Sequence, residues 1–205
     1  IARLNMVEFA LGPTGHNQHT GAVRNPWNTD HITGGSSSGS GSAVAAGLAF
    51  GALGSDTGGS IRTPSACCGL VGMKPTYGRV SRAGAMPLSF SLDHVGPLTR
   101  TVRDNALMLQ AVAGSDPRDP TTSHLPVLDF LEGIEKDIRG LRIAVCEDFF
   151  GDSLDDEVAA LTNTSLDVYR RLGATIVPVR FPEMQDLVAL TTVLSSSESA
   201  GYHAS

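Results

Sequence analysis

Lysine is almost missing from this sequence: Lys74 and Lys136 are the only two among 205 residues. Charged residues of all kinds make up 18% of the chain, below the ~25% that is usual for globular domains, and the net charge is −6. Nucleic-acid-binding proteins need clustered basic side chains, and this sequence has no such cluster. We therefore expect no direct nucleic-acid partner.

Long apolar runs are missing too. No stretch approaches the ~18 apolar residues of a membrane-spanning helix, and no signal peptide is visible. These absences predict no membrane partner and a cytoplasmic location. Glycine, in contrast, is abundant at 23 residues, which indicates many tight turns in a protein that is large enough to bury a core.

Few side chains are suited to metal or disulfide chemistry. The odd set of cysteines lacks metal-ligand spacing, so we expect reduced core thiols at Cys67, Cys68 and Cys146. An alternative metal site would use three histidines of one polar segment, namely His16, His19 and His31. We interpret these histidines as loop residues near the mouth of an active site, and we predict neither a metal ion nor an organic cofactor.

What the sequence does have is a stretch dense in serine and glycine, residues 34–62. It contains two Ser/Gly-rich turns, which we call the first nest (residues 34–40) and the second nest (residues 55–60). Residues 43–50 lie between them and carry no charge. That run favours a buried helix capped by a nearby serine over a flexible linker.

The second nest has the residue types of an oxyanion hole. Consecutive glycines allow successive backbone N–H groups to point into one concavity, because no Cβ atom blocks the approach. A serine becomes a useful nucleophile only when a base takes its proton and donors stabilise the oxyanion that forms. We therefore predict an oxyanion hole at Thr57, Gly58 and Gly59, with the reactive hydroxyl of Ser60 at its end.

Four further residues are predicted to support this site. Asp56 and Arg62 flank the glycines symmetrically, so we expect them to form a buried ion pair. Contact between Arg62 and the substrate is the alternative. Ser37 and Ser55 lie in the two nests and are predicted to support the same site.

Two other motifs compete for the first nest. A phosphate-binding loop reads G-x-x-x-x-G-K-[ST], and Gly34 and Gly39 match its glycines, but Ser40 stands where lysine belongs. A nucleophile elbow, G-x-S-x-G, matches residues 35–39 and would make Ser37 the nucleophile. Such an elbow follows an apolar strand, and the residues before this one are polar.

The two nests together closely resemble the amidase signature family of serine hydrolases. The resemblance extends from Asn5 to about Asp119 and includes the GGSSSGS and GSDTGGSIR elements. It implies that Ser60 is the nucleophile and that Ser36, held across a cis peptide, relays its proton. It also implies that the N–H groups of residues 57–60 bind the oxyanion and that a lysine on an upstream strand is the base.

That lysine has no match in this chain. Both lysines follow Ser60, and Lys74 matches a family position outside the catalytic triad. The chain begins at Ile1 without an initiator methionine and stops within a helical pattern. We therefore expect an internal fragment of a longer protein, with very low activity of residues 1–205 alone.

The resemblance implies an α/β fold with a mixed central sheet covered by helices on both faces, incomplete in this chain. We expect a single domain in two portions: a signature core with the catalytic serines (residues 1–120) and a β-α-β scaffold (residues 121–205). In the core, Thr101 and Gly114 bound an amphipathic helix whose buried face would start at Val102. We also expect a strand end and a short helix over residues 1–12, a turn and a strand over residues 76–81, and a linker over residues 116–120.

The scaffold portion has its own pattern. We predict a strand over residues 141–146, a helix over 155–172 and a parallel strand over 174–179. A last helix follows from residue 183. We expect its Glu198 and Tyr202 to be solvated, and a position facing a substrate channel is the alternative.

The main functional prediction is an amidase that cleaves a small-molecule carboxamide through an acyl-enzyme on Ser60, with residues 86–92 lining the acyl pocket. The alternative within the family is the glutamine-hydrolysing component of the tRNA-dependent amidotransferase, its A subunit. Ala83 and residues 86–90 depart from the sequence of that component and favour a stand-alone amidase. We expect the protein to form a homodimer or, if it is the amidotransferase component, to bind partner subunits. An alternative of another class is a non-catalytic paralogue or binding subunit.

Overall fold

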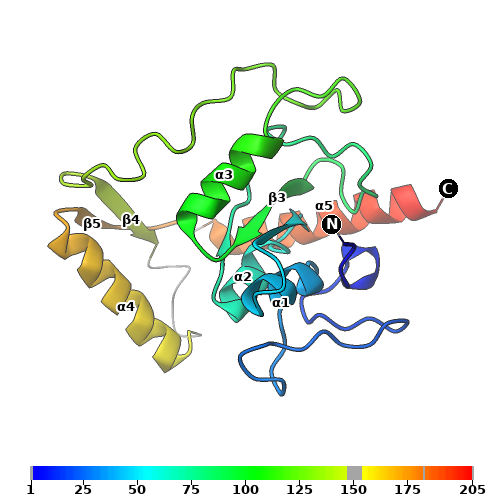
Figure 1. Ribbon diagram of the computed structural model, residues 1–205, viewed down its shortest axis with the longest axis horizontal. Coiled ribbons are helices and arrows are strands. Elements are labelled where there is room, and N and C mark those ends of the chain that lie inside the picture. The colour runs from blue at the N-terminus through cyan, green and yellow to red at the C-terminus, as the bar shows by residue number, and fades with distance from the viewer. Residues whose placement is uncertain (1, 147–153, 182, 205) are drawn as a thin grey trace. The chain divides into compact units, whose positions relative to one another are not determined.

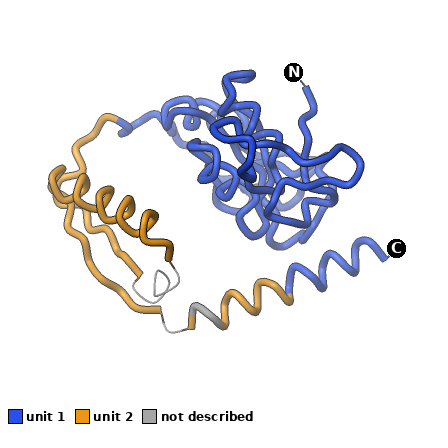
Figure 2. The backbone as a smooth tube through the Cα atoms, turned by 90° about the horizontal axis from the view of Figure 1, so that it is seen from below, with its two compact units in different colours: residues 1–134, 194–205 blue, residues 135–193 orange. Residues whose placement is uncertain are grey.

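The structure is a computed structural model that describes residues 2–146, 154–181 and 183–204 (Figure 1). The chain divides into two compact units, one of residues 1–134 and 194–205 and the other of residues 135–193 (Figure 2). Helices occur with both antiparallel and parallel strand pairs. The α/β class predicted from the sequence is therefore confirmed.

The first unit is built on a three-stranded antiparallel sheet. Strand β3 (His94–Thr99) lies between β1 (Gly51–Asp56) and β2 (Val71–Gly72), so the order is β1-β3-β2. Leu98 of β3 is completely buried at the centre of this unit. The sheet thus holds the end of β1, where the second nest begins, against a packed core.

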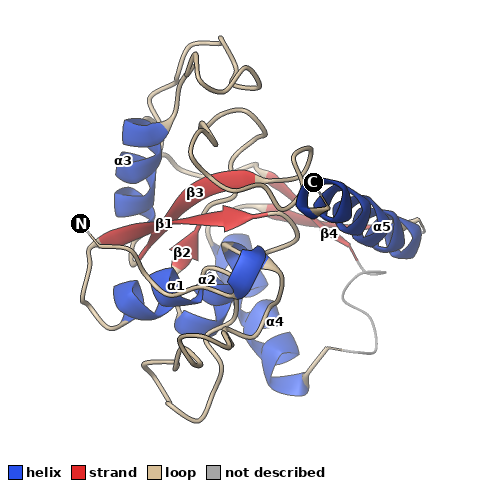
Figure 3. Cartoon of the chain, turned by 90° about the vertical axis from the view of Figure 1, so that its right-hand side faces the viewer, coloured by secondary structure: helices blue, strands red, loops and turns tan. Residues whose placement is uncertain are grey.

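Helices pack on both faces of this sheet. Helices α1 (Ser38–Ala45) and α2 (Arg62–Cys68) lie on one side of the strands (Figure 3). A Cβ atom on Gly54 would come within 2.6 Å of Ser37 Oγ beside α1, whereas one on Gly51 would clash with Met108 Sδ of the third helix. Because these two positions of β1 face opposite ways, the third helix covers the other face.

The prediction for the apolar run between the nests is only partly right. Helix α1 starts inside the first nest at Ser38 and ends at Ala45, five residues before the run does. Gly47, with φ +74°, turns the chain out of the helix, and Leu48 and Phe50 are 82% and 88% exposed. The chain then enters β1, a strand that the glycine-rich sequence did not predict.

Helix α3 (Val102–Val112) confirms the predicted capping pattern. The Thr101 hydroxyl accepts a hydrogen bond from the backbone N–H of Asp104 at 3.1 Å, and Gly114 follows the last turn. The predicted buried face is wrong at its start, because Val102 is 59% exposed. Asn105 takes the buried place instead and donates to the carbonyls of β2 and β3 at 2.9 and 3.2 Å.

The second unit confirms the predicted β-α-β pattern. Strand β4 (Arg142–Cys146) pairs in parallel with β5 (Thr175–Val179), and α4 (Asp156–Arg171) connects them along the chain. The carboxylate of Asp155 caps α4 by accepting hydrogen bonds from its first turn. The last helix, α5 (Met184–His203), begins in this unit and ends in the first.

Three short features complete the description. A 3₁₀ turn, η1 (Glu8–Ala10), replaces the helix expected near the N-terminus. The turn predicted within residues 76–81 is present, with the Arg79 N–H bonded to the Thr76 carbonyl at 3.0 Å, but the predicted strand is reduced to an isolated bridge at Val80. Of the helices in the described part of the chain, none is both long enough and apolar enough to cross a membrane.

We expect Gly54→Ala to destabilise the protein, because the new methyl group would meet Ser37 Oγ at 2.6 Å and Leu98 Cδ1 at 2.9 Å. Overpacking of this kind costs about 1–3 kcal/mol in the free energy of unfolding, measured by urea denaturation. Gly201→Ala is the matched control, since nothing lies within 4 Å of its Cβ position in α5. Equal stability of the two variants would contradict this packing.

Candidate active site

The glycine loop, residues 57–60, joins the end of β1 to the start of α2. Gly59 has φ +139°, and a Cβ atom there would lie 2.9 Å from Thr63 Oγ1, so the loop needs glycine at this position. The Gly59 carbonyl accepts a hydrogen bond from the Thr63 N–H at 2.7 Å. The backbone N–H groups of the four loop residues donate no hydrogen bond to any described residue, which leaves them available to an oxyanion.

Ser60 ends the glycine loop and is partly buried. Its carbonyl oxygen accepts the backbone N–H of Ser37 at 3.3 Å, so the two nests are in direct contact. Its hydroxyl makes no hydrogen bond with any residue that the structure describes. The side chain predicted to be the nucleophile is therefore not bound by a structural contact.

Ser36 follows a cis peptide bond from Gly35, in agreement with the resemblance. Its backbone carbonyl is fixed by the N–H groups of Val7 at 3.1 Å and Ser38 at 2.8 Å. The side chain is fully buried, yet its hydroxyl has no hydrogen-bond partner among the described residues. Buried hydroxyls are normally paired, so the unpaired hydroxyl of Ser36 is an exception among the described residues.

Ser37 has a structural place that excludes the nucleophile elbow. Its hydroxyl donates to the Ser55 carbonyl at 3.3 Å and accepts the Ser55 N–H at 3.2 Å. The residue is 5% exposed, and residues 33–37 form no strand, although an elbow requires one. Ser37 and Ser55 thus join α1 to β1 and hold the nests together.

The expected ion pair between Asp56 and Arg62 is present. The Arg62 guanidinium donates from Nε at 3.0 Å and from Nη2 at 2.9 Å to the two carboxylate oxygens of Asp56. The N–H groups of Ile61 and Arg62 also donate to this carboxylate, at 3.2 and 3.3 Å. Burial alone would raise the pKa of Asp56, but these hydrogen bonds and the Arg62 charge outweigh it and hold the pKa below its usual value.

The neighbouring Asp93 and His94 do not form a catalytic dyad. The Asp93 carboxylate accepts the Thr57 hydroxyl at 2.5 Å and the N–H groups of Leu88 and Ser89 at 2.8 and 3.0 Å. His94 directs Nδ1 to the Leu92 carbonyl at 2.6 Å and Nε2 to Lys74 Nζ at 3.3 Å. An ammonium only donates, so Nε2 accepts and Nδ1 carries the proton. Lys74 is therefore bonded to His94 and not to the hydroxyl of Ser36.

A cavity of about 190 Å³ opens beside the glycine loop, where Thr57 lines it. The cavity loop, residues 86–92, supplies one wall through Met86, Pro87, Leu88 and Phe90. Residues predicted to line an acyl pocket therefore do line a cavity. The rest of the lining includes small or apolar residues, Ala10, Ala83, Ala85 and Val95, and a group that we call the polar wall: Ser55, Arg82, Asp93, His94, Arg118 and Asp119.

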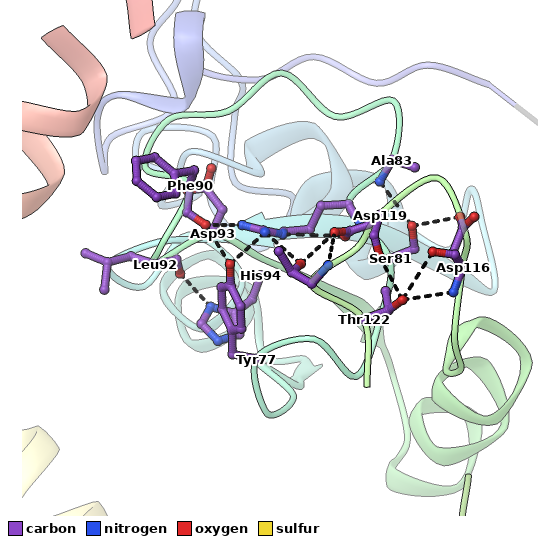
Figure 4. A network of polar contacts seen from close by, with 12 residues as sticks. Tyr77, Ser81, Ala83, Phe90, Leu92, Asp93, His94, Asp116, Asp119 and Thr122 are labelled. Carbon is purple, nitrogen blue, oxygen red and sulfur yellow. Dashed lines mark hydrogen bonds and ion pairs between the residues drawn. The ribbon is translucent and has the colours of Figure 1, made fainter. Parts of the chain in front are cut away.

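The polar wall was not predicted, because residues 116–120 were interpreted as a linker. Asp119 is instead 6% exposed and accepts the Arg82 N–H at 2.8 Å, while Asp116 accepts the Ser81 hydroxyl at 2.8 Å (Figure 4). The Arg82 side chain donates to the Phe90 carbonyl and, at 2.7 Å, to the Tyr77 hydroxyl. This network fixes the cavity loop from one side.

Glu198 of α5 also contradicts its prediction, since it is not a solvated helix residue. Its carboxylate accepts the hydroxyl of Ser89 at 2.5 Å and both the hydroxyl and the N–H of Ser91, at 2.7 and 3.1 Å. These hydrogen bonds lower the pKa of Glu198 although desolvation opposes them. The contact joins residues 109 positions apart in sequence, and no local pattern could have indicated it.

The histidines considered as metal ligands form no such cluster among the described residues. His16 contacts the Thr14 hydroxyl at 3.0 Å and His19 contacts Glu8 at 3.2 Å. In the part of the chain that the structure describes, no three His, Cys, Asp or Glu side chains gather as metal ligands would. All three cysteines are free thiols.

Comparison with known proteins places these features in a family. The family model described as Amidase matches residues 1–205. The chain is 49% identical over 200 residues to the A subunit of glutamyl-tRNA(Gln) amidotransferase from Geobacillus stearothermophilus. That alignment covers 98% of this chain and 41% of the relative, so the chain spans about two fifths of the length of the curated relatives it matches.

Solved structures give the same picture. The A subunit of glutamyl-tRNA(Gln) amidotransferase from Thermotoga maritima superimposes with a TM-score of 0.95 at 40% identity, covering 98% of this chain and 44% of that one. The native peptide amidase of Stenotrophomonas maltophilia superimposes with a TM-score of 0.85 at 36% identity, covering 98% of this chain and 43% of that one.

We expect Arg62→Ala to cost about 3 kcal/mol of unfolding free energy at pH 7, the lower end for breaking a buried pair. The lower end applies because 53% of the Arg62 side chain is exposed while Asp56 is fully buried. Arg170→Ala, which breaks the exposed pair with Asp167 in α4, is the matched control and should cost at most about 0.5 kcal/mol.

The same pair sets a pH dependence. The lowered pKa of Asp56 means that its contribution to stability is complete above about pH 4 and is lost as the pH falls through the folded-state pKa. We expect the unfolding free energy of the wild type to fall more steeply below pH 4 than that of Asp56→Asn. Parallel pH profiles from urea denaturation would contradict this assignment.

Proposed function

The chain belongs to the amidase signature family, and on that premise we propose that it carries the nucleophile, the proton relay and the oxyanion hole of an amide-hydrolysing site. Ser60 is the nucleophile, Ser36 is the relay, and the N–H groups of residues 57–60 bind the oxyanion. The observation that supports this most is that the Ser60 hydroxyl makes no hydrogen bond with a described residue. Ser60 also stands at the end of a loop whose backbone N–H groups donate to no described residue.

The chemistry follows from these positions. Ser60 Oγ attacks the amide carbon and loses its proton towards Ser36, and the carbonyl oxygen becomes an oxyanion at the glycine loop. Ser36 then protonates the leaving nitrogen, so that ammonia or an amine departs and an ester to Ser60 remains. Water hydrolyses the ester by the same steps in reverse, which releases the acid and restores both hydroxyls.

The proton needs a base that these residues do not supply. Asp56 and Asp93 are already occupied by several donors, and Lys74 contacts His94. The family resemblance implies a lysine as this base, and in a buried site its pKa must fall from about 10.4 for it to be neutral. We therefore propose that hydrolysis requires a protein that provides this lysine beside Ser36.

For the substrate we propose glutamine, as in the amidotransferase alternative, rather than the stand-alone amidase that was preferred from Ala83 and the cavity loop. What supports this choice is the higher identity to amidotransferase A subunits, 46–49% among curated relatives, than to the peptide amidase, 36%. The cavity beside Thr57 would receive the glutamine side chain, and partner subunits would complete the enzyme.

Labelling with a fluorophosphonate tests the nucleophile. In the longest form of the protein that carries this chain, we expect one adduct, on Ser60, that is lost in Ser60→Ala. Ser36→Ala should slow labelling by about 10²-fold or more, because it removes the proton relay. Ser42→Ala, on the outer side of α1, is the matched serine control and should label at the wild-type rate. No adduct in a folded protein would favour the non-catalytic paralogue, and an adduct on Ser37 would restore the elbow.

Ammonia release tests the substrate. We expect the protein, together with its partner subunits, to hydrolyse glutamine with at least about 10-fold higher kcat/KM than a peptide amide or an aryl amide. Without partner subunits, glutamine hydrolysis should be weaker. Efficient hydrolysis of another amide by the protein alone would instead support the stand-alone amidase, and Ser60→Ala is the blank for both measurements.

A further inference from the structure

Two carboxylates hold the cavity loop, residues 86–92, and they come from different parts of the chain. Asp93 accepts the N–H groups of Leu88 and Ser89 and also contacts Thr57 of the glycine loop. Glu198 accepts the hydroxyls of Ser89 and Ser91 and the N–H of Ser91. The loop is thus bonded to two carboxylates, one at its own C-terminal end and one in α5.

Glu198 acts on the part of the loop that faces the cavity. Phe90 lies between the two serines, lines the cavity, and is 63% exposed. Its carbonyl oxygen is held from the other side by the Tyr77 hydroxyl at 2.8 Å (Figure 4). Ser89 is fully buried, so solvent cannot reach its hydroxyl to replace the hydrogen bond to Glu198. The direction of the Phe90 side chain therefore depends on the bonds of both neighbouring serines.

We propose that Glu198 is a positioning residue that fixes the cavity loop for binding of the amide substrate. Through Ser89 and Ser91 it places Leu88 and Phe90 where the acyl side chain would pack. This inference rests on the proposed function, since it treats the cavity as the acyl site of Ser60. It assigns to the last turns of α5 a part in substrate selection.

The contacts separate this role from catalysis. Glu198 makes no recorded contact with Ser36, Ser60 or the glycine loop, so its removal should leave the chemical step in place. A change confined to substrate packing appears in KM, and most strongly for substrates whose acyl group fills the cavity. A helix anchor without a positioning role would lower stability but would change KM equally for large and small amides.

Glutamine is the conservative replacement at this position. Its carbonyl oxygen accepts the two bonds that Glu198 Oε2 receives, and its amide nitrogen donates to the Ser91 hydroxyl, which also accepts. Glu198→Gln therefore keeps the geometry and loses only the charge, whereas Glu198→Ala loses all three bonds. Asp186→Ala removes an exposed carboxylate from the same helix and is the matched control.

The test is steady-state kinetics with glutamine and with a small aliphatic amide, using the complete protein with its partner subunits. We expect Glu198→Ala to raise KM for glutamine about 10-fold, with kcat within about 3-fold of wild type and a smaller change in KM for the small amide. Glu198→Gln should restore KM to within about 3-fold, and Asp186→Ala should match the wild type. A fall in kcat at unchanged KM would overturn the proposal.

Amide hydrogen exchange of residues 86–92 provides a readout that does not use activity. The Ser91 N–H is protected by its bond to Glu198, so Glu198→Ala should speed exchange in this segment, and Glu198→Gln and Asp186→Ala should not. Unchanged exchange in an active protein would overturn this proposal alone. Wild-type protein that neither hydrolyses amides nor labels at Ser60 would overturn the proposed function and this inference with it.

Discussion

The buried carboxylate of Asp56 is the group on which the rest of the site depends. It ends β1, has no exposed surface, and accepts two bonds from the Arg62 side chain and two from backbone N–H groups at the start of α2. Burial of a charge is costly unless hydrogen-bond donors surround it. Residues 61 and 62, at most six positions further along the chain, supply those donors. Residues 57–60 form the tight turn between Asp56 and these donors, and the N–H groups of the turn itself donate to no described residue. The geometry of the proposed oxyanion hole is thus a consequence of satisfying one carboxylate.

Two hydrogen bonds connect the glycine loop to the other parts of the site. The Ser37 N–H bonds to the Ser60 carbonyl and connects the loop to the first nest, where Ser36 lies buried. The Thr57 hydroxyl bonds to Asp93 and connects the loop to the cavity wall. Because the backbone and short side chains make both contacts, few rotatable bonds separate the three parts. The proposed nucleophile, the proposed relay and the cavity wall are thus held in one rigid arrangement, which suits a reaction that needs all three correctly positioned.

Features that depend on near neighbours in sequence could be predicted, and features that depend on distant partners could not. The Thr101 cap and the Asp56–Arg62 pair join residues three and six positions apart, and the sequence indicated both. Strands β4 and β5 pair across a longer separation, but each strand and the helix between them has its own local pattern, which the sequence also showed. Asp119 and Glu198 meet partners 37 and 109 residues away, so one was interpreted as linker and the other as solvated. The bounds of α1 were predicted wrongly for another reason. Serine and glycine are weak helix formers, and only packing on β1 makes them helical.

The same contacts restrict what the catalytic base can be. Every acidic side chain described around the site is already an acceptor: Asp56 for Arg62, Asp93 for Thr57, Asp119 for Arg82 and Glu198 for two serines. For Asp56, Asp119 and Glu198 these hydrogen bonds lower the pKa of the carboxyl group, so these three carboxylates are poor acceptors for the proton of Ser60. The one buried hydroxyl without a described partner is that of Ser36. A polar group in that condition costs about 1–3 kcal/mol, which a folded protein tolerates where a further group completes the contact. A neutral lysine, the base implied by the family resemblance, would both accept the proton and satisfy that hydroxyl.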